Sequence, residues 1–132
     1  MKKIFFVVFV LSAILLAACG GGSSEPAALD AVPAEYAGAT NPLGADAAAA
    51  GAGAFKVNCA SCHGEKGYGD GPAGAALDPA PKNLVEVAAL AGDDYLYWRL
   101  NTGKEGTAMI AWKGVLTDEQ IWQAVAYIRT LK

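Results

Sequence analysis

The sequence predicts an all-α protein whose helices are joined by long loops. Residues 46–57 are rich in alanine, which has the highest helix propensity. Residues 118–131 follow a helix-capping sequence and place apolar side chains every three or four positions. No stretch of useful length alternates apolar and polar residues as a strand does, and no internal repeat is visible. We therefore expect helices to be the regular elements of this chain.

The first eighteen residues are predicted to be a signal peptide. Lys2 and Lys3 supply positive charge, and residues 4–16 form an apolar run that only Ser12 interrupts. Thirteen residues are too few to cross a bilayer, which needs about 20, but they suit the apolar region of an export signal. Residues 1–18 are thus expected to direct export and then to be removed.

Cys19 directly follows this run and is predicted to carry a lipid. Residues 16–19 read Leu-Ala-Ala-Cys, which resembles the lipobox of bacterial lipoproteins, where the signal is cut before a cysteine that is then diacylated. The chain has three cysteines, and lipidation of Cys19 leaves an even pair. An ordinary signal peptide that is cleaved nearby is the alternative.

The rest of the chain divides into a linker and one domain. Residues 19–45 are rich in Gly, Ser, Ala and Pro and have few large apolar side chains. They are predicted to be a lipidated flexible tether, with room for local order near its end. Residues 46–132 then form a single domain, which is too small to bury much core by itself. A bound apolar group would supply the missing core.

The first half of this domain is expected to be a helix followed by a loop. The helix over 46–57 contains Gly51 and Gly53, and the cost of about 1 kcal/mol for each needs a reason, such as the close approach of a second helix. Residues 64–82 are rich in Gly and Pro and are therefore predicted to be a loop.

The second half should contain two more helices. Asp93 or Asp94 caps a short helix that runs through Leu100 and that Gly103 can close, and a loop over 103–116 follows. The last helix, over 118–131, begins at a capping box and presents one apolar face: Ile121, Ala124, Val125, Ile128 and Leu131.

The decisive motif is Cys-Ala-Ser-Cys-His at residues 59–63, which is typical of a c-type haem attachment site. Two thiols at this spacing can add to the two vinyl groups on one edge of a porphyrin, and the next residue then places its imidazole under the iron. Cys59 and Cys62 are therefore predicted to bind haem c covalently. His63, the only histidine in the chain, is predicted to be an axial ligand of the iron.

Three other kinds of site use cysteines at this spacing. A zinc site requires four ligands, and this motif offers only Cys59, Cys62 and His63, so a distant carboxylate would have to supply the fourth. A thioredoxin-like dithiol wants a preceding strand and a βαβ framework, and neither is predicted. A plain disulfide would leave the domain short of core. The haem site accounts for all three residues at once.

Met109 is the predicted second axial ligand. It is the only methionine that remains after the signal peptide is removed, and it lies in a loop 46 residues after His63. A lone methionine is more often a core residue that fills a gap. The loop sequence around it, Gly-Thr-Ala-Met at residues 106–109, favours iron ligation instead.

Residues 51–132 resemble the class I cytochromes c. The resemblance rests on the motif at 59–63 and on residues around it: Gly51, Phe55, Met109 in its loop, and Ala126-Tyr127-Ile128. It implies the cytochrome c fold, in which three to five helices with long loops surround one covalent haem. It also implies that the first and last helices cross near Gly51 and that one haem edge is exposed.

Two positions depart from the family pattern. The family often has proline directly after the methionine ligand, and this chain has Ile110, so the loop is expected to be less rigid. The family's prolyl carbonyl that accepts the proximal imidazole N–H should come from Pro79 or Pro81, and we favour Pro81. The alternative is that both prolines only shape the loop.

Several other residues are expected around the haem. The predicted pocket lining is Leu77, Leu84, Leu100 and Ile110. Most of the aromatic side chains are expected to be core packing around the macrocycle. The candidates for a donor to a haem propionate are Trp112, Trp98 and Arg99, of which Trp112 is assigned to the site.

These residues predict an electron carrier rather than an enzyme. An iron with two protein ligands has no open position for a substrate, so its economical use is outer-sphere transfer of single electrons. The alternative is a haem-based ligand sensor or a peroxidase-like enzyme in which Met109 leaves the iron.

The expected partners are redox proteins in or at the extracytoplasmic face of a bacterial membrane. The expected electron donor is a quinol-oxidising complex or a photosynthetic donor, and the expected acceptor is a terminal oxidase. The chain would act as a free shuttle between them or as a subunit of a larger respiratory complex. Without residues 1–18, eight basic residues face thirteen acidic ones, a net charge of −5. This acidic balance argues against nucleic acid as a partner.

Overall fold

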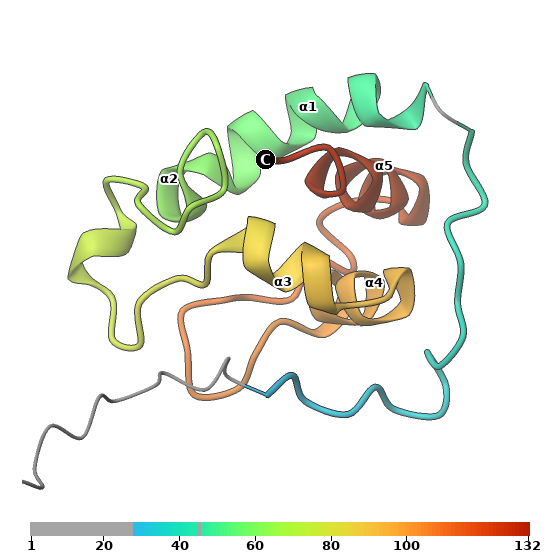
Figure 1. Ribbon diagram of the computed structural model, residues 1–132, viewed down its shortest axis with the longest axis horizontal. Coiled ribbons are helices and arrows are strands. Elements are labelled where there is room, and N and C mark those ends of the chain that lie inside the picture. Colours follow the sequence, from blue (N-terminus) through green and yellow to red (C-terminus); the bar gives the residue numbers. More distant parts are fainter. Residues whose placement is uncertain (1–27, 45) are drawn as a thin grey trace, which may run out of the picture.

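The computed structural model describes residues 28–44 and 46–132; the predicted signal peptide (1–18) and Cys19 lie outside them. The described residues contain no strand beyond an isolated bridge between Lys113 and Leu116. The elements are α1 (Ala47–Asn58), α2 (Ala60–His63), the 3-10 helix η1 (Gly74–Ala76), α3 (Leu84–Leu90), α4 (Asp93–Thr102) and α5 (Asp118–Ile128). The predicted all-α fold is confirmed (Figure 1). None of these helices is long and apolar enough to cross a membrane.

Helices α1 and α5 pack across each other, and α1 lies along the upper edge of the domain in Figure 1. Gly51 is buried at the crossing, where a Cβ atom would lie 1.9 Å from the carbonyl oxygen of Gln123. One turn later, the ring of Phe55 packs against that of Tyr127, with centroids 5.0 Å apart. The expected crossing near Gly51 is therefore present. Gly53 has no neighbouring atom within 4 Å, so close approach explains only one of the two glycines.

Helix α5 begins as predicted and ends earlier than predicted. The hydroxyl of Thr117 accepts from the backbone N–H of Gln120, and the Gln120 side chain accepts from the N–H of Thr117, which completes the capping box. The helix ends at Ile128 rather than 131 because the next turn tightens: Thr130 and Leu131 donate to carbonyls three residues back. The buried face comprises Ile121, Trp122, Ala124, Val125 and Ile128.

Helix α4 starts at Asp93 and ends at Thr102, two residues beyond the predicted end at Leu100. Gly103 closes it as predicted, with a φ of +67°. The prediction that Asp93 or Asp94 caps the helix is wrong. The N-cap is Gly92, in an extended conformation and without a side-chain hydrogen bond, and both aspartates fall inside the first turn. Their negative charges still lie where they stabilise the helix dipole.

Helix α3 was not expected from the sequence. Asn83 caps it, because its side-chain oxygen accepts from the N–H of Val85 at 3.0 Å while its amide donates to Glu86 at 3.0 Å. The spacing of Asn83 and Glu86 is a capping signal that could have predicted this helix. The preceding loop over 64–82 is present as predicted and contains only η1.

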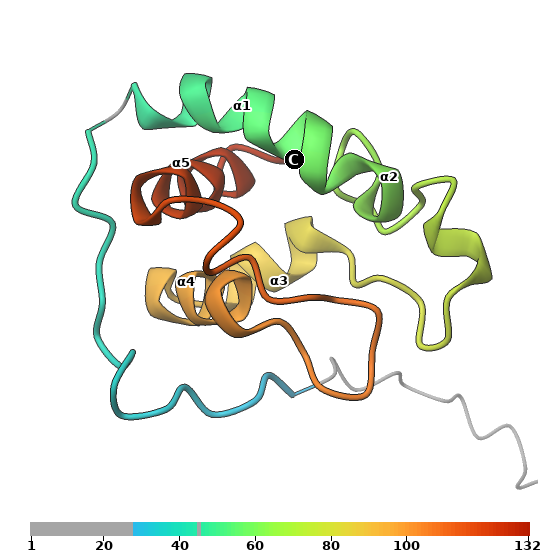
Figure 2. The same cartoon turned by 180° about the vertical axis from the view of Figure 1, so that it is seen from behind.

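Residues 28–44, which we call the N-terminal strap, run along the outside of the domain before they reach α1 (Figures 1 and 2). Leu29 packs against the core, and the side-chain amide of Asn41 donates to the backbone carbonyl of Trp122 at 2.9 Å. Residues 28–44 of the predicted tether therefore contact the domain, and residues 19–27 lie outside the described residues. Composition could not reveal these contacts, because each joins the strap to residues more than fifty positions away.

Candidate haem-binding site

A cavity of about 720 Å³ lies between the corner of α1 and α2, helices α3 and α4, and the loop over 103–116. All the residues predicted to hold haem line it: Cys59, Cys62, His63, Pro81, Leu84, Met109 and Trp112. The predicted apolar lining is also found there: Leu77, Leu100 and Ile110. Residues that are far apart in the sequence thus converge on one space.

The two cysteines lie at the corner where α1 meets α2. Cys59 is both the C-cap of α1 and the N-cap of α2, so Cys62 and His63 follow within one helical turn. Neither thiol forms a disulfide with a described residue, and burial raises the pKa of the Cys59 thiol to about 11, with a smaller contribution from Cys62. A thiol that is held neutral is a poor metal ligand, because metal binding needs the thiolate.

His63 is held in one orientation by the backbone. Its Nδ1 lies 3.1 Å from the carbonyl oxygen of Lys82, and because a carbonyl can only accept, Nδ1 is the nitrogen that donates. Burial lowers the pKa of the imidazole, and the hydrogen bond to Lys82 partly opposes this shift. The ring is therefore favoured as a neutral group with Nε2 free of its proton, which is the form that binds iron.

The prediction that Pro81 supplies this carbonyl is wrong, and Pro79 does not supply it either. Residues 81–83 have no regular secondary structure, and the Pro81 carbonyl faces Gly69, where a Cβ atom would lie 2.5 Å from it. The next carbonyl, from Lys82, reaches His63. Pro81 lines the cavity and shapes the segment that delivers the acceptor.

Met109 lies in a loop that is fixed by backbone hydrogen bonds. Its N–H donates to the Thr107 hydroxyl at 3.1 Å, and its carbonyl accepts from the N–H of Lys104 at 2.9 Å. Gly103 allows this close return of the chain, because a Cβ atom there would lie 2.4 Å from the Met109 carbonyl. Met109 and His63 thus reach the same cavity from separate elements.

Trp112 carries the clearest sign of an absent hydrogen-bond partner. Its backbone is fixed by a hydrogen bond to the Leu100 carbonyl at 2.8 Å, yet its buried Nε1 has no partner among the described residues. A buried donor without an acceptor costs about 1–3 kcal/mol, so one is expected. Of the other two candidate donors, Arg99 lines the cavity and Trp98 is not among the lining residues.

These features fit haem c. The two thiols, the neutral imidazole and the thioether line a largely apolar space, and an indole N–H at its wall lacks an acceptor that a carboxylate would provide. Cys59 and Cys62 would hold the macrocycle, and His63 and Met109 would bind its iron. The described residues contain no group of three or more His, Cys, Asp or Glu side chains that could share a metal ion.

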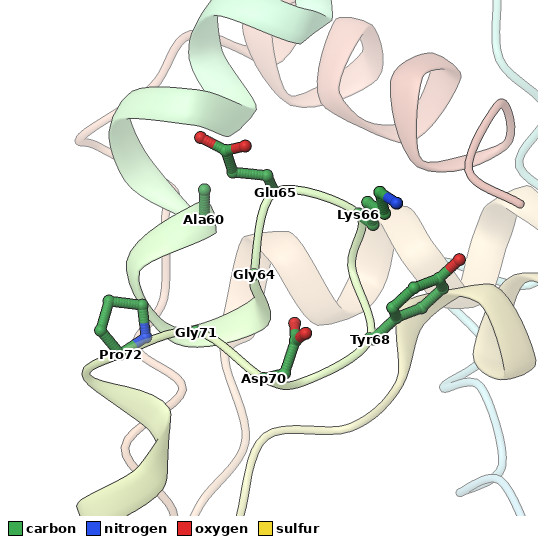
Figure 3. A pocket seen from close by; sticks show the side chains of 8 residues that line it. All are labelled: Ala60, Gly64, Glu65, Lys66, Tyr68, Asp70, Gly71 and Pro72. Atoms are coloured by element: carbon green, nitrogen blue, oxygen red, sulfur yellow. The ribbon is translucent and has the colours of Figure 1, made fainter.

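A second hollow, of about 410 Å³, lies over the loop that follows α2 (Figure 3). It is lined by Ala60, Gly64, Glu65, Lys66, Tyr68, Asp70, Gly71 and Pro72. Asp70 points toward Gly64, and the Tyr68 hydroxyl donates to the carbonyl of Lys132 at 2.8 Å. None of the residues predicted to bind haem lines this hollow.

The sequence matches a known family over most of the domain. The model of the family described as Cytochrome C oxidase, cbb3-type, subunit III matches residues 46–128. Cytochrome c6 of Parathermosynechococcus lividus is 36% identical over 78 residues, which cover 59% of this chain and 83% of that protein. Cytochrome c6 of Thermostichus vulcanus is 37% identical over 78 residues, which cover 64% of that protein.

The fold also matches solved structures. A chain of the Kuenenia stuttgartiensis reducing HAO-like protein complex superposes with a TM-score of 0.58 at 26% identity, over 68% of this chain and 46% of that chain. The KustC0563 c-type cytochrome superposes with a TM-score of 0.54 at 23% identity, over 62% of this chain and 96% of that chain, which supports the fold alone. The chain therefore belongs to the cytochrome c family that this family model describes, and it is a class I monohaem c-type cytochrome with covalently bound haem c.

Proposed function

We propose that this cytochrome is a membrane-anchored carrier of single electrons whose haem iron is bound by His63 and Met109. Electron transfer is the role of the family, and the identity of the two axial ligands is what we propose for this chain. The observation that supports them is that both side chains line one cavity, with the Nδ1 of His63 already engaged by Lys82. This leaves Nε2 as the nitrogen available to the iron.

Iron ligation by both His63 and Met109 favours electron transfer over catalysis. Haem iron supplies a one-electron couple, and two protein ligands leave it no open position for oxygen, peroxide or a substrate. The role of the protein is then to fix His63 through a backbone carbonyl and Met109 through the loop bonds to Thr107 and Lys104. The apolar lining keeps water away from the iron.

Three further residues are proposed to hold the macrocycle. Trp112 Nε1 donates to a propionate, which removes the cost of a buried donor without a partner. Pro81 and Leu84 line the cavity, where they contribute apolar contact. Arg99, which also lines the cavity, is a second candidate for a donor to a propionate.

We also propose that residues 1–18 direct export and that Cys19 carries the lipid that tethers the domain to the extracytoplasmic face of a bacterial membrane. The support is the sequence of residues 1–19. A tether keeps the domain near membrane partners and raises its effective concentration there. The names of the matching proteins, a subunit of an oxidase and cytochromes c6, favour redox complexes as partners, such as a quinol-oxidising or photosynthetic donor and a terminal oxidase.

The axial ligands are tested by optical spectroscopy of the full chain, exported together with a cytochrome maturation system. The wild type should be low-spin, show the weak long-wavelength band of methionine bound to ferric iron, and leave carbon monoxide unbound when reduced. Met109→Ala should lose the band and bind the gas. Val115→Ala is the matched control, because Val115 is 65% exposed, lies in the same loop and is not among the residues that line the cavity.

The same experiment examines the alternative function. If the reduced wild type binds carbon monoxide readily, or the oxidised wild type is high-spin, Met109 is not a firm ligand. The protein would then act as a ligand sensor or a peroxidase-like enzyme with an open iron position. In that case Met109→Ala and the wild type should bind the gas with similar affinity.

The anchor is tested separately by replacing Cys19. Cys19→Ser should keep the haem spectrum, because Cys59 and Cys62 attach the macrocycle, but it should move the protein from the membrane fraction to the soluble extracytoplasmic fraction. Incorporation of labelled palmitate into the wild type and not into Cys19→Ser supports lipidation. Equal membrane retention of both proteins would contradict it.

A further inference from the structure

The N-terminal strap forms part of the wall of the haem cavity. Ala28, Leu29 and Asp30 line the cavity beside Arg99 of α4 and Lys104 of the following loop. Leu29 also packs against the hydrophobic core. The strap therefore reaches the cofactor site, which residues outside the helical domain were not expected to do.

Asp30 joins two cations at this wall. Its Oδ2 forms ion pairs with Arg99 Nη2 and with Lys104 Nζ. The Arg99 side chain is only 16% exposed; it lies 3.9 Å from the ring centre of Trp98 and donates to the Gly103 carbonyl at 3.1 Å. Because these two contacts fix Arg99, the carboxylate that meets it is fixed as well.

The strap does not depend on Asp30 alone for its position. The N–H of Gly38 donates to the Asp94 carboxylate at 2.9 Å, and the Asn41 side chain donates to the Trp122 carbonyl at 2.9 Å. These bonds attach the strap to α4 and α5 at a distance from Asp30 in the sequence. A change that only removes the charge of Asp30 should therefore leave the strap in place.

We propose that the Asp30 carboxylate, held at the cavity wall by Arg99 and Lys104, lowers the reduction potential of the haem. The ferric site carries one more positive charge than the ferrous site, so a carboxylate in the wall favours the ferric state. Asp30 also offsets part of the positive charge of Arg99 and Lys104, which would favour the ferrous state. The inference goes beyond the proposed function and holds whichever group completes the coordination of the iron.

The test is the reduction potential of full-length holoprotein, measured by optical titration of the haem bands. Asp30→Asn should have a more positive potential than the wild type, with the same thermal unfolding temperature within a few degrees. Glu35→Gln is the control, because Glu35 is exposed on the same strap and forms no ion pair with a described residue. It removes the same charge and should change the potential much less.

A purely structural role predicts the opposite sign. If loss of Asp30 released the strap, water would enter the cavity, stabilise the more highly charged ferric site and lower the potential. A potential for Asp30→Asn that is lower than that of the wild type, or equal to that of Glu35→Gln, would overturn the proposal.

Lys104 gives a second and independent arm. Lys104→Gln keeps the backbone bond from residue 104 to Met109 and removes a positive charge, so its potential should fall. The double variant Asp30→Asn with Lys104→Gln should lie between the two single variants. If Asp30→Asn yields no holoprotein, a Lys104→Gln potential that is unchanged or raised overturns the proposal.

Binding of carbon monoxide by the wild type would refute the axial role of Met109 without changing these expectations.

Discussion

Gly51 in α1 lies so close to Gln123 in α5 that a Cβ atom at position 51 would be 1.9 Å from the Gln123 carbonyl oxygen. That oxygen belongs to helix backbone, so it cannot turn aside as the tip of a side chain could. The crossing of the two helices therefore requires glycine at this position. The same helix continues through Phe55 to Cys59, so the crossing also fixes where the first thioether cysteine meets the cavity.

Gly51→Ala should destabilise the protein by about 3 kcal/mol or more, at the upper end of the usual cost of overpacking, because two helix backbones must separate. Urea unfolding of the oxidised holoprotein measures this loss. The variant that contrasts with it is Gly53→Ala in the same helix, where no atom lies within 4 Å. It should gain about 0.5–1 kcal/mol, because alanine loses less conformational entropy than glycine in a helix. Equal effects of the two substitutions would contradict the close approach.

The features that the sequence predicted well are those with local signals. The capping box at Thr117 and Gln120, the Gly103 stop of α4 and the attachment motif at 59–63 each lie within a few residues, and their local geometry is present. The family resemblance added the long-range crossing at Gly51, which no local pattern contains.

The features that the sequence missed depend on contacts over long distances. Which carbonyl meets His63 depends on the path of the loop past Gly69, and counting residues to a proline selected Pro81 instead of Lys82. The strap lacks apolar periodicity, so its attachment through Asp30 and Asn41 could be seen only once α4 and α5 were in place.

Trp112→Phe should reveal whether the buried indole meets a haem propionate. A hydrogen bond to a charged group contributes about 1.5–3 kcal/mol, so the holoprotein should lose that much stability. Loss of the donor also disfavours the ionised propionate, so the pKa of the propionate should rise. The pH range over which the reduction potential of the haem varies should move upward with it. Trp122→Phe removes the same volume from a side chain that does not line the cavity. If Trp112→Phe changes the pH profile of the reduction potential no more than Trp122→Phe does, the Nε1 donor has another role.

Gly69→Ala should disturb the acceptor of the His63 hydrogen bond. The new Cβ would lie 2.5 Å from the Pro81 carbonyl, and relief of that overlap moves the adjoining Lys82 carbonyl. A weaker hydrogen bond makes the imidazole a poorer donor to iron, which disfavours the ferric state, so the potential should rise. Gly114→Ala is the matched control, since φ is positive at both positions and nothing lies within 4 Å of the added atom. It should cost about 1 kcal/mol of strain and leave the potential unchanged; a shift as large as that of Gly69→Ala would speak against the Lys82 contact.

Asp30 should make the stability of the protein depend on pH in the acid range. The Lys104 ammonium, which donates to the carboxylate, and the Arg99 guanidinium hold the pKa of Asp30 below its ordinary value of 3.8. Between the lowered pKa and 3.8, the unfolded chain binds more protons than the folded one, so the free energy of unfolding rises with pH. The contribution is complete above 3.8 and is lost as the pH falls through the folded pKa. Because the carboxylate is 43% exposed and therefore screened, we expect at most about 1 kcal/mol.

The measurement is the difference in unfolding free energy between the wild type and Asp30→Asn, followed from about pH 5 downward through the window of the Asp30 titration. Taking the difference cancels the other carboxylates and the propionates, which titrate in both proteins. The difference should shrink toward zero as the pH falls, because the wild-type carboxyl becomes neutral like the amide of the variant. A difference that stays constant would mean that Asp30 acts through shape rather than charge, and one that grows would mean that its pKa is raised and that the two cations do not hold it.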